Sequence, residues 1–460
     1  MDSFSGVGPP TIADATPPRL RPVLGLWDLI YYGVVAVSPI APVTVFGLAL
    51  TLSRGHAVDT ILVAMVAMML TAFSYGRMAA LYPSAGSAYT YVGRGLNPHL
   101  GFLAGWAMLL DYLVIPVFCV IFGSLSAQRL VPGVPYPVLV VLFTGTITFL
   151  NLLGIRSVAR ANQILLAFMG GVFLLFVILA LRFLFLHEGW QGIFSWQPMY
   201  NPATFSVRAI AAGTSFAALN YLGFDSVTTL AEDVENPRRN VLLATVLVCL
   251  FTGIFSSLII YLGQRVWPDY QTFSHIETAF MEVTQRVGGA PLFSAMAVVV
   301  IVAVLGSALA AQAGASRLLF GLGRDNVLPR KLFGHLDPKR NSPNFNIWLI
   351  GLIALAGSFV LNYELTAEVL NFGAFLGFMG VNLAVIRQYY FVGKPGQKKS
   401  LLMDAIVPGL GFLFCFAIWW GLQAPAKIAG GAWFVGGFVY HAIRTRGFRL
   451  PPVMLNLDEG

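Results

Sequence analysis

Charged residues are scarce in this sequence. Asp, Glu, Lys and Arg together make up 10% of its 460 residues, whereas an ordinary soluble domain carries about 25%. Hydrophobic residues reach 57%, and the mean hydropathy is +0.76. This composition excludes a soluble globular domain and predicts an all-α polytopic membrane protein that has the lipid bilayer as its solvent.

Cysteines, histidines and catalytic motifs are also few. The three cysteines, Cys119, Cys249 and Cys415, lie in apolar stretches, which excludes a disulfide framework and favours simple packing. The six histidines are scattered, and His187-Glu188 lacks the second histidine of a metalloprotease helix. No GxSxG or Walker motif stands out. We therefore expect no enzyme, no metal site and no cofactor.

Signs of a channel or a sensor are missing as well. A channel usually shows selectivity-filter repeats or rings of charge, and the sequence has neither. A sensor needs a soluble output domain, and the polar stretches are too short for one. A transporter is the function class that remains.

Basic charge is unevenly distributed. The net charge of +8 would suit a nucleic acid partner, but its placement indicates a role in membrane topology instead. With about twelve apolar stretches and a cytoplasmic N-terminus, about 21 of the Lys and Arg residues fall inside and about 7 outside. This bias predicts a multi-pass protein of the cell (inner) membrane with both termini cytoplasmic and no nucleic acid partner. Residues 1–20 are expected to form a disordered cytoplasmic tail without a signal-peptide cleavage pattern.

Two apolar segments are interrupted near their middles. The first, at about residues 26–50, contains Ser38-Pro39, and the second, at about residues 208–232, contains Gly223. Each break frees backbone groups that lipid cannot satisfy, so these groups must line a cavity or meet a ligand. Paired interrupted helices in matching halves of a chain are typical of the binding site of a secondary transporter.

Short motifs along the chain resemble those of the amino acid/polyamine/organocation (APC) transporter family. They lie at residues 73–77, 83–91, 97–106, 223–225, 236–240, 315–319, 323–329 and 371–374. Within the family, the chain is most similar to the putrescine-importer branch. That likeness rests on Leu110-Asp111-Tyr112, on residues 222–230, and on the Ser38-Pro39 that replaces a Gly-rich first break.

The resemblance implies a LeuT-type fold with about 12 transmembrane helices. Helices 1–5 (residues 21–190) and helices 6–10 (residues 200–393) would form 5+5 inverted repeats in which helices 1 and 6 are discontinuous. Helices 11 and 12 (residues 400–446) and a cytoplasmic tail (residues 447–460) would complete the chain. The implied mechanism is alternating access around a site near the membrane midplane.

The first break offers Val37, Ser38 and Pro39 to a substrate. Proline removes a backbone donor and disfavours helix in the residue before it. The carbonyls of Val37 and Ser38 and the Ser38 hydroxyl would then face the ligand. An ordinary proline kink is the alternative interpretation.

The second break offers Asn220, Tyr221, Gly223 and Phe224. Gly223 supplies backbone freedom, and the free N–H groups of a half-helix suit a carboxylate while opposing carbonyls suit an ammonium. Tyr221 and Phe224 would hold a cationic amine by cation–π contact or act as gates. Simple packing of both rings is the alternative.

Two intramembrane acids are the sharpest single candidates. A carboxylate at membrane depth is costly and usually marks a pathway or a partner. Asp225 follows the second break and would bind an ammonium or carry a coupling proton, unless it is a structural acid. Asp111 would lie beside both breaks in the implied fold, unless it is a polar contact between helices. Two acids near one cavity suit a diamine, which carries an amine at each end and no carboxylate.

The coupling ion stays open at this point. Several relatives place a lysine in helix 5 where its ammonium stands in for sodium, but the equivalent stretch here has none, and Met169 lies near that position. Ser307 and Ser316 are candidates for a sodium site, and Asp225 is the candidate proton carrier. The coupling ion is therefore H⁺ or Na⁺.

The sequence thus predicts a secondary active transporter of a small amine or amino acid across the plasma membrane. We expect ion-coupled import of a polyamine such as putrescine. An amino acid permease or exchanger for cationic or neutral amino acids is the alternative. The protein is expected to be a monomer or a homodimer.

Overall fold

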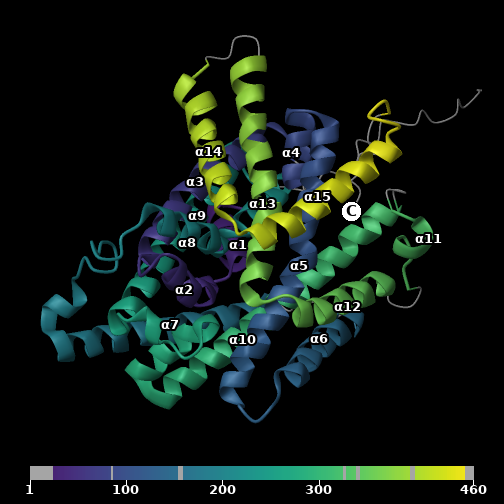
Figure 1. Ribbon diagram of the computed structural model, residues 1–460. Coiled ribbons are helices and arrows are strands. Elements are labelled where there is room, and N and C mark those ends of the chain that lie inside the picture. Colours follow the sequence, from purple (N-terminus) through teal and green to yellow (C-terminus); the bar gives the residue numbers. More distant parts are fainter. Residues whose placement is uncertain are drawn as a thin grey trace, which may run out of the picture.

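The protein is helical throughout the described chain. A computed structural model describes residues 24–83, 86–153, 159–324, 328–337, 342–393 and 399–450, and for residues 159–165 the backbone alone. Within these ranges the regular structure is helix, apart from one isolated bridge between Leu24 and Val234 (Figure 1). The predicted all-α class is confirmed. The predicted tail 1–20, and residues 451–460 of the second tail, lie outside the described residues.

The helices follow one another with short connections. The α-helices are α1 (Leu26–Val37), α2 (Ala41–Leu52), α3 (Ala57–Leu81), α4 (Ser87–Gly95), α5 (Pro98–Leu130), α6 (Tyr136–Leu153), α7 (Ala159–Ile193), α8 (Val207–Ala217), α9 (Pro237–Val266), α10 (Ala279–Arg324), α11 (Arg330–Phe333), α12 (Asn344–Val360), α13 (Tyr363–Val385), α14 (Val407–Gly421) and α15 (Ala424–Arg444). Shorter 3-10 and π segments are η1 (Ala218–Tyr221), η2 (Phe224–Asp233), η3 (Tyr270–Thr272), η4 (Ile276–Thr278), η5 (Ile386–Val392) and η6 (Leu402–Ile406).

Many of these helices are long and apolar enough to cross a membrane. The described part holds 8 such helices, or 9 if α1 and α2 are one span bent by 50° at a break. A helix needs about 20 apolar residues to span the hydrocarbon region. The chain is therefore a polytopic membrane protein, as predicted from its composition.

The chain crosses between two faces, which we name after Leu24 and Gly55. The Leu24 N–H donates to Asp233 O (3.0 Å), so the start of α1, the end of η2 and the start of α9 share one face. At the far ends of α2 and α9, the Gln264 side-chain Nε2 donates to Gly55 O (2.5 Å). We call these the Leu24 face and the Gly55 face.

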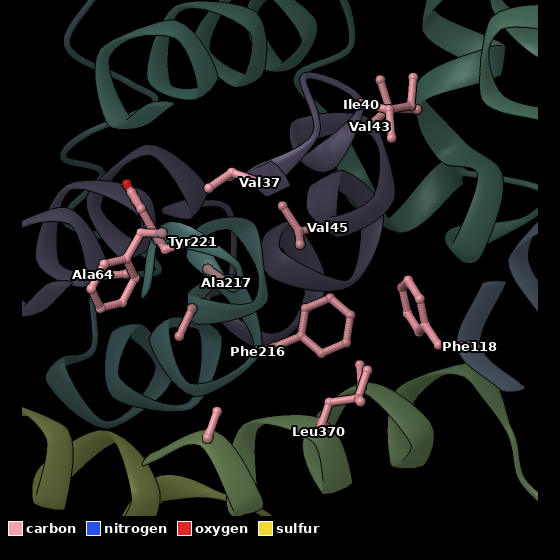
Figure 2. Packing of buried hydrophobic residues seen from close by; sticks show 14 of the residues in the cluster. Val37, Ile40, Val43, Val45, Ala64, Phe118, Phe216, Ala217, Tyr221 and Leu370 are labelled. Atoms are coloured by element: carbon pink, nitrogen blue, oxygen red, sulfur yellow. The ribbon is translucent and has the colours of Figure 1, made fainter. Parts of the chain in front are cut away.

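Helix α5 lies at the centre of the bundle. It packs on α10, α13, α12, α6 and α15, and its Phe118 stacks on Tyr363 of α13 with ring centroids 5.0 Å apart. Nearby, Val37, Val45 and Phe216 come together from three different elements in one buried cluster (Figure 2). The broken segments are thus held inside the helical core rather than on its lipid-facing surface.

A buried amide joins three of the helices around α5. Gln312 of α10 donates from Nε2 to Thr148 Oγ1 of α6 (3.1 Å) and to Ile347 O of α12 (3.1 Å). Its Oε1 accepts from Asn151 Nδ2 (2.7 Å). We call this set the Gln312 hub, and in it both polar atoms of the amide are hydrogen-bonded.

Candidate functional site

The first break lies where the sequence predicts it. Helix α1 ends at Val37, Ser38 takes φ +69°, and α2 begins at Ala41. The Ser38 N–H donates to Val34 O and Val35 O (3.2 Å each), and the Ala41 N–H donates to Ser38 O (3.1 Å). The proline ring at position 39 supplies no N–H, so it leaves the break short of donors.

The second break differs from an interrupted α-helix. Helix α8 gives way to η1, Gly223 takes φ +104°, and η2 continues to Asp233 as a 3-10 helix. Hydroxyls bond the backbone three residues earlier: Ser226 Oγ to Gly223 O (2.6 Å) and Thr228 Oγ1 to Asp225 O (2.7 Å). Such hydroxyls compete with the backbone N–H groups for the carbonyl acceptors of an α-helix. This competition is the physical reason that the segment after Gly223 forms a 3-10 helix and not an α-helix.

The two breaks meet at Gly223. A Cβ at this position would lie 2.9 Å from Ala36 O of α1, too close for any side chain, and the positive φ adds strain for other residues. The end of α1 therefore touches the start of η2. The Ala36 carbonyl oxygen of α1 lies at this junction, where a ligand would find an acceptor.

Two carboxylates lie on either side of this region. Asp225 stands in the first turn of η2, and Asp111 is on α5, close enough for their charges to repel. The Asp225 carboxylate accepts from its own backbone N–H and lies beside Ser87. Asp111 Oδ1 is buried and has no hydrogen-bond partner in the described structure. No Lys or Arg of the described chain forms an ion pair with either acid.

Tyrosines close the cluster from α3 and α4. The Tyr75 and Tyr91 rings are 5.9 Å apart and edge-on, and both residues lie near the Asp225 charge. The Tyr75 hydroxyl is buried, and the described structure gives it no partner. Tyr112, next to Asp111 on α5, lies near both carboxylates. We call Asp111, Asp225, Ser87 and these three tyrosines the acid cluster.

Several residues of the acid cluster were missed from the sequence. Tyr75, Ser87 and Tyr91 fall inside the family motifs at 73–77 and 83–91, yet no site role was assigned to them. The feature of the sequence that could have identified them is a polar side chain within an apolar segment or a family motif. Their convergence on Asp225 depends on contacts between distant helices, which one sequence does not contain.

The other predicted residues of the second break, which flank Gly223, contact α3 and α9. The Tyr221 hydroxyl donates to Ile61 O of α3 (2.8 Å), and Figure 2 shows Tyr221 beside Ala64. Asn220 Oδ1 accepts from Ser256 Oγ of α9 (3.0 Å). Phe224 packs edge-on against Tyr75, with ring centroids 5.5 Å apart. Phe224 thus adjoins the acid cluster, whereas these contacts direct Asn220 and Tyr221 toward α9 and α3.

The candidate ion-coupling residues Ser307 and Ser316 both lie on α10. Ser316 Oγ donates to Ala313 O (2.9 Å), and Ser316 O accepts from Asn346 Nδ2 of α12 (3.1 Å). Ser307 is half-buried on the same helix. Gly314 lies beside Tyr112, so this helix passes the acid cluster. Met169 of α7 lies near the position where several relatives carry a lysine, and its side chain is buried in the core.

Comparison with known proteins gives one consistent result. The family model described as amino acid permease matches residues 34–422. The low-affinity putrescine importer PlaP of Escherichia coli (strain K12) is 32% identical over 438 residues, covering 94% of this chain and 96% of the relative. The branched-chain amino acid permease BcaP of Lactococcus lactis subsp. cremoris is 26% identical, with 85% and 87% covered. The methylthioribose transporter of Bacillus subtilis is 27% identical, with 93% and 94% covered.

Proposed function

The chain belongs to the amino acid permease family, and on this premise we propose that it imports a small amine across the cell membrane by alternating access. The substrate we propose is a diamine such as putrescine. The substrate-binding residues are those of the two breaks together with the acids: Val37, Ser38, Pro39, Asp111, Asn220, Tyr221, Gly223, Phe224 and Asp225. Tyr75, Ser87 and Tyr91 join them as lining residues.

A shortage of free backbone donors at the first break carries this proposal. From residue 38 to residue 43, two positions are prolines, and the N–H groups of three others donate to carbonyls of α1 or of the segment itself. The Ile40 N–H is left without a described partner. At the second break, the Asp225 carboxylate accepts from its own backbone N–H, and Asn220 Nδ2 is a buried donor without a partner in the described structure. A substrate carboxylate needs such donors, and an unpaired one is costly at membrane depth.

Acceptors, in contrast, are plentiful there. The carboxylates of Asp111 and Asp225 lack a described cationic partner, and the Ala36 carbonyl faces the junction of the breaks. Two ammonium groups on one short chain would relieve the repulsion between the acids. A substrate with an amine at each end and no carboxylate fits this arrangement best, and PlaP is named as an importer of one.

The order of helices supports the LeuT-type arrangement with twelve spans. Counting α1 with α2 as one discontinuous helix and α8 with η1 and η2 as another, α1–α7 and α8–α13 each supply five spans, with α4 and α11 outside the count. Helices α14 and α15 then follow as helices 11 and 12. We propose the inverted 5+5 repeat on this basis, with the repeats at residues 21–190 and 200–393.

We further propose that Asp225 carries a coupling proton. It stands in the first turn of η2 at the break itself, and no Lys or Arg of the described chain forms an ion pair with its carboxylate when the substrate is absent. Ser307 and Ser316 remain the candidates for a sodium site. The transport cycle that we propose needs no cofactor and no enzymatic step.

The Leu24 face is proposed to be cytoplasmic. Arg238, Arg239 and Arg77 lie at helix ends on that side, which agrees with an excess of basic residues inside. Both termini would then be cytoplasmic in the inner membrane. The protein would work as a monomer or a homodimer.

Uptake by proteoliposomes tests the proposal. Labelled putrescine is offered in sodium-free buffer under an imposed proton gradient. Saturable uptake that disappears when the gradient is collapsed is the expected result. Uptake of a branched-chain or cationic amino acid without uptake of putrescine would replace the diamine importer by an amino acid permease, and uptake that requires sodium would remove Asp225 as the coupling acid.

A further inference from the structure

A polar cavity opens on the Gly55 face, away from the acid cluster. Its walls come from the turn between α2 and α3, the connection between α7 and α8, and the end of α9. The residues that matter for its chemistry are Arg54, Gln197, Thr204, Gln264, Arg265 and Tyr270. Nothing in the transport mechanism proposed above uses this cavity.

One lining residue of the cavity, Gln264, has a buried acceptor atom without a hydrogen-bond donor. Its side chain is 6% exposed, and Nε2 donates to Gly55 O at 2.5 Å, which fixes the orientation of the amide. Oε1 is buried and accepts no hydrogen bond within the described structure. A buried acceptor left unpaired is costly, so an occupant should bring an O–H or N–H group to this atom.

The two arginines of the cavity differ in their partners. Arg265 is buried and neutralised: Nη2 pairs with Glu188 Oε2 (2.5 Å), and Nε donates to Gly192 O (2.9 Å). Arg54 is an exposed residue of the cavity lining, and its guanidinium has no hydrogen bond or ion pair among the described residues. The cavity therefore presents one free positive charge and one free buried acceptor.

The connection that walls the cavity carries exposed aromatic rings. Trp190, Phe194 and Trp196 are 68%, 76% and 79% exposed. In Figure 1 the end of α7 and the connection to α8 project from the helical body. Exposed tryptophans at the end of a membrane span are typical of the interface where lipid headgroups lie. We therefore expect the connection that walls the cavity to lie at the depth of the lipid headgroups.

We propose that this cavity binds the phosphoglycerol headgroup of a lipid in the leaflet at the Gly55 face. The phosphate pairs with the Arg54 guanidinium, and a glycerol hydroxyl donates to Gln264 Oε1. A choline headgroup has no donor for Oε1. An ethanolamine headgroup has donors, but it brings an ammonium to a cavity whose one free charge, Arg54, is also positive. The net negative headgroup with hydroxyls satisfies both needs.

Native mass spectrometry of the detergent-purified full chain tests the proposal without any mutation. Phosphatidylglycerol is compared with phosphatidylmethanol, which has the same charge but no headgroup hydroxyl, and with phosphatidylcholine. We expect phosphatidylglycerol to be retained about tenfold better than phosphatidylmethanol, the size of one well-formed hydrogen bond to a buried acceptor. Equal retention of the two anionic lipids would overturn the proposal.

Variants and a soluble competitor locate the site and its source. Arg54→Asn keeps a residue that tolerates the positive φ of Arg54 (+55°) and should lower phosphatidylglycerol retention about tenfold. Arg208→Gln removes an exposed charge from the same face without touching the cavity and should leave retention unchanged. Unchanged retention in Arg54→Asn would contradict the assignment. Displacement of the lipid by equimolar glycerol 1-phosphate would show that a free phosphate ester, rather than a membrane lipid, is the occupant.

Discussion

The Gln312 hub and the acid cluster are two buried polar regions that flank the same helix, α5. They differ in whether their buried polar atoms have hydrogen-bond partners. Both polar atoms of the Gln312 amide have protein partners, from Thr148, Ile347 and Asn151. In the acid cluster, Asp111 Oδ1 and the Tyr75 hydroxyl have none within the described chain. The hub is complete without a ligand, whereas the cluster is not.

This difference separates stability from function. A satisfied buried network fixes the arrangement of its helices, and an unsatisfied one in lipid is tolerated where a ligand or a cavity supplies the missing partners. Mutations in the hub should therefore change stability and leave substrate recognition alone. Mutations in the cluster should do the reverse.

The largest expected effect is that of Asp225→Asn. Uptake of putrescine should fall about 100-fold or more, because an amide neither carries a proton nor balances an ammonium. Asp59→Asn, which removes a half-buried acid from the first turn of α3, is the matched control and should transport normally. Normal gradient-driven uptake by Asp225→Asn would take this residue out of the mechanism.

Asp111→Asn should discriminate between substrates. Its apparent KM for putrescine should rise about tenfold, while that for butylamine, with one amine, should change little, because only the second ammonium loses its partner. Competition curves for both amines in the same proteoliposomes measure this. An equal loss for both amines would instead assign Asp111 a structural role.

Gln312→Met should act on stability alone. Removing the amide leaves the Asn151 and Thr148 groups without their partner, at a cost of about 1–3 kcal/mol in the free energy of unfolding. Thermal unfolding in detergent measures this, with Gln271→Met, an exposed glutamine, as the control. A changed KM for putrescine in Gln312→Met would contradict the assignment of stability to the hub and of substrate recognition to the cluster.

Tyr75→Phe should have the smallest effect. In contrast to Gln312→Met, it should change substrate binding and not stability. The hydroxyl is buried without a described partner, so its loss should leave the unfolding temperature unchanged or slightly raised. The KM for putrescine should rise about fivefold, the value of one neutral hydrogen bond. A lowered unfolding temperature with an unchanged KM would show that Tyr75 belongs to the scaffold.

The positions of both breaks could be read from the sequence, because the residues that cause them are local. Ser38-Pro39 ends α1 by removing a donor, and Gly223 is the residue that fits a positive φ beside Ala36 O. The character of η2 was missed, since the competition of Ser226 and Thr228 for their own backbone depends on rotamers. The approach of Tyr75 and Tyr91 to Asp225 was missed because it brings three distant segments together.

The distribution of polar residues gave the acids but not their surroundings. Asp111 and Asp225 stand out because carboxylates at membrane depth are rare. Tyr221 was expected to hold an amine by cation–π contact or to act as a gate, and the bond from its hydroxyl to Ile61 O emerges only from the packing of α3 against η1. Direction of a side chain is set by neighbours that lie far away in the chain, so it has no local signature.

The central claim is that the site accepts an amine and has no place for a carboxylate. Putrescine and ornithine differ by one carboxylate on an otherwise identical diamine, so their competition for labelled putrescine uptake tests the claim directly. We predict that ornithine competes at least about tenfold more weakly, because its carboxylate would lie unpaired beside Asp111 and Asp225. Equal competition by ornithine would show that its carboxylate finds sufficient donors at the breaks and would contradict the account.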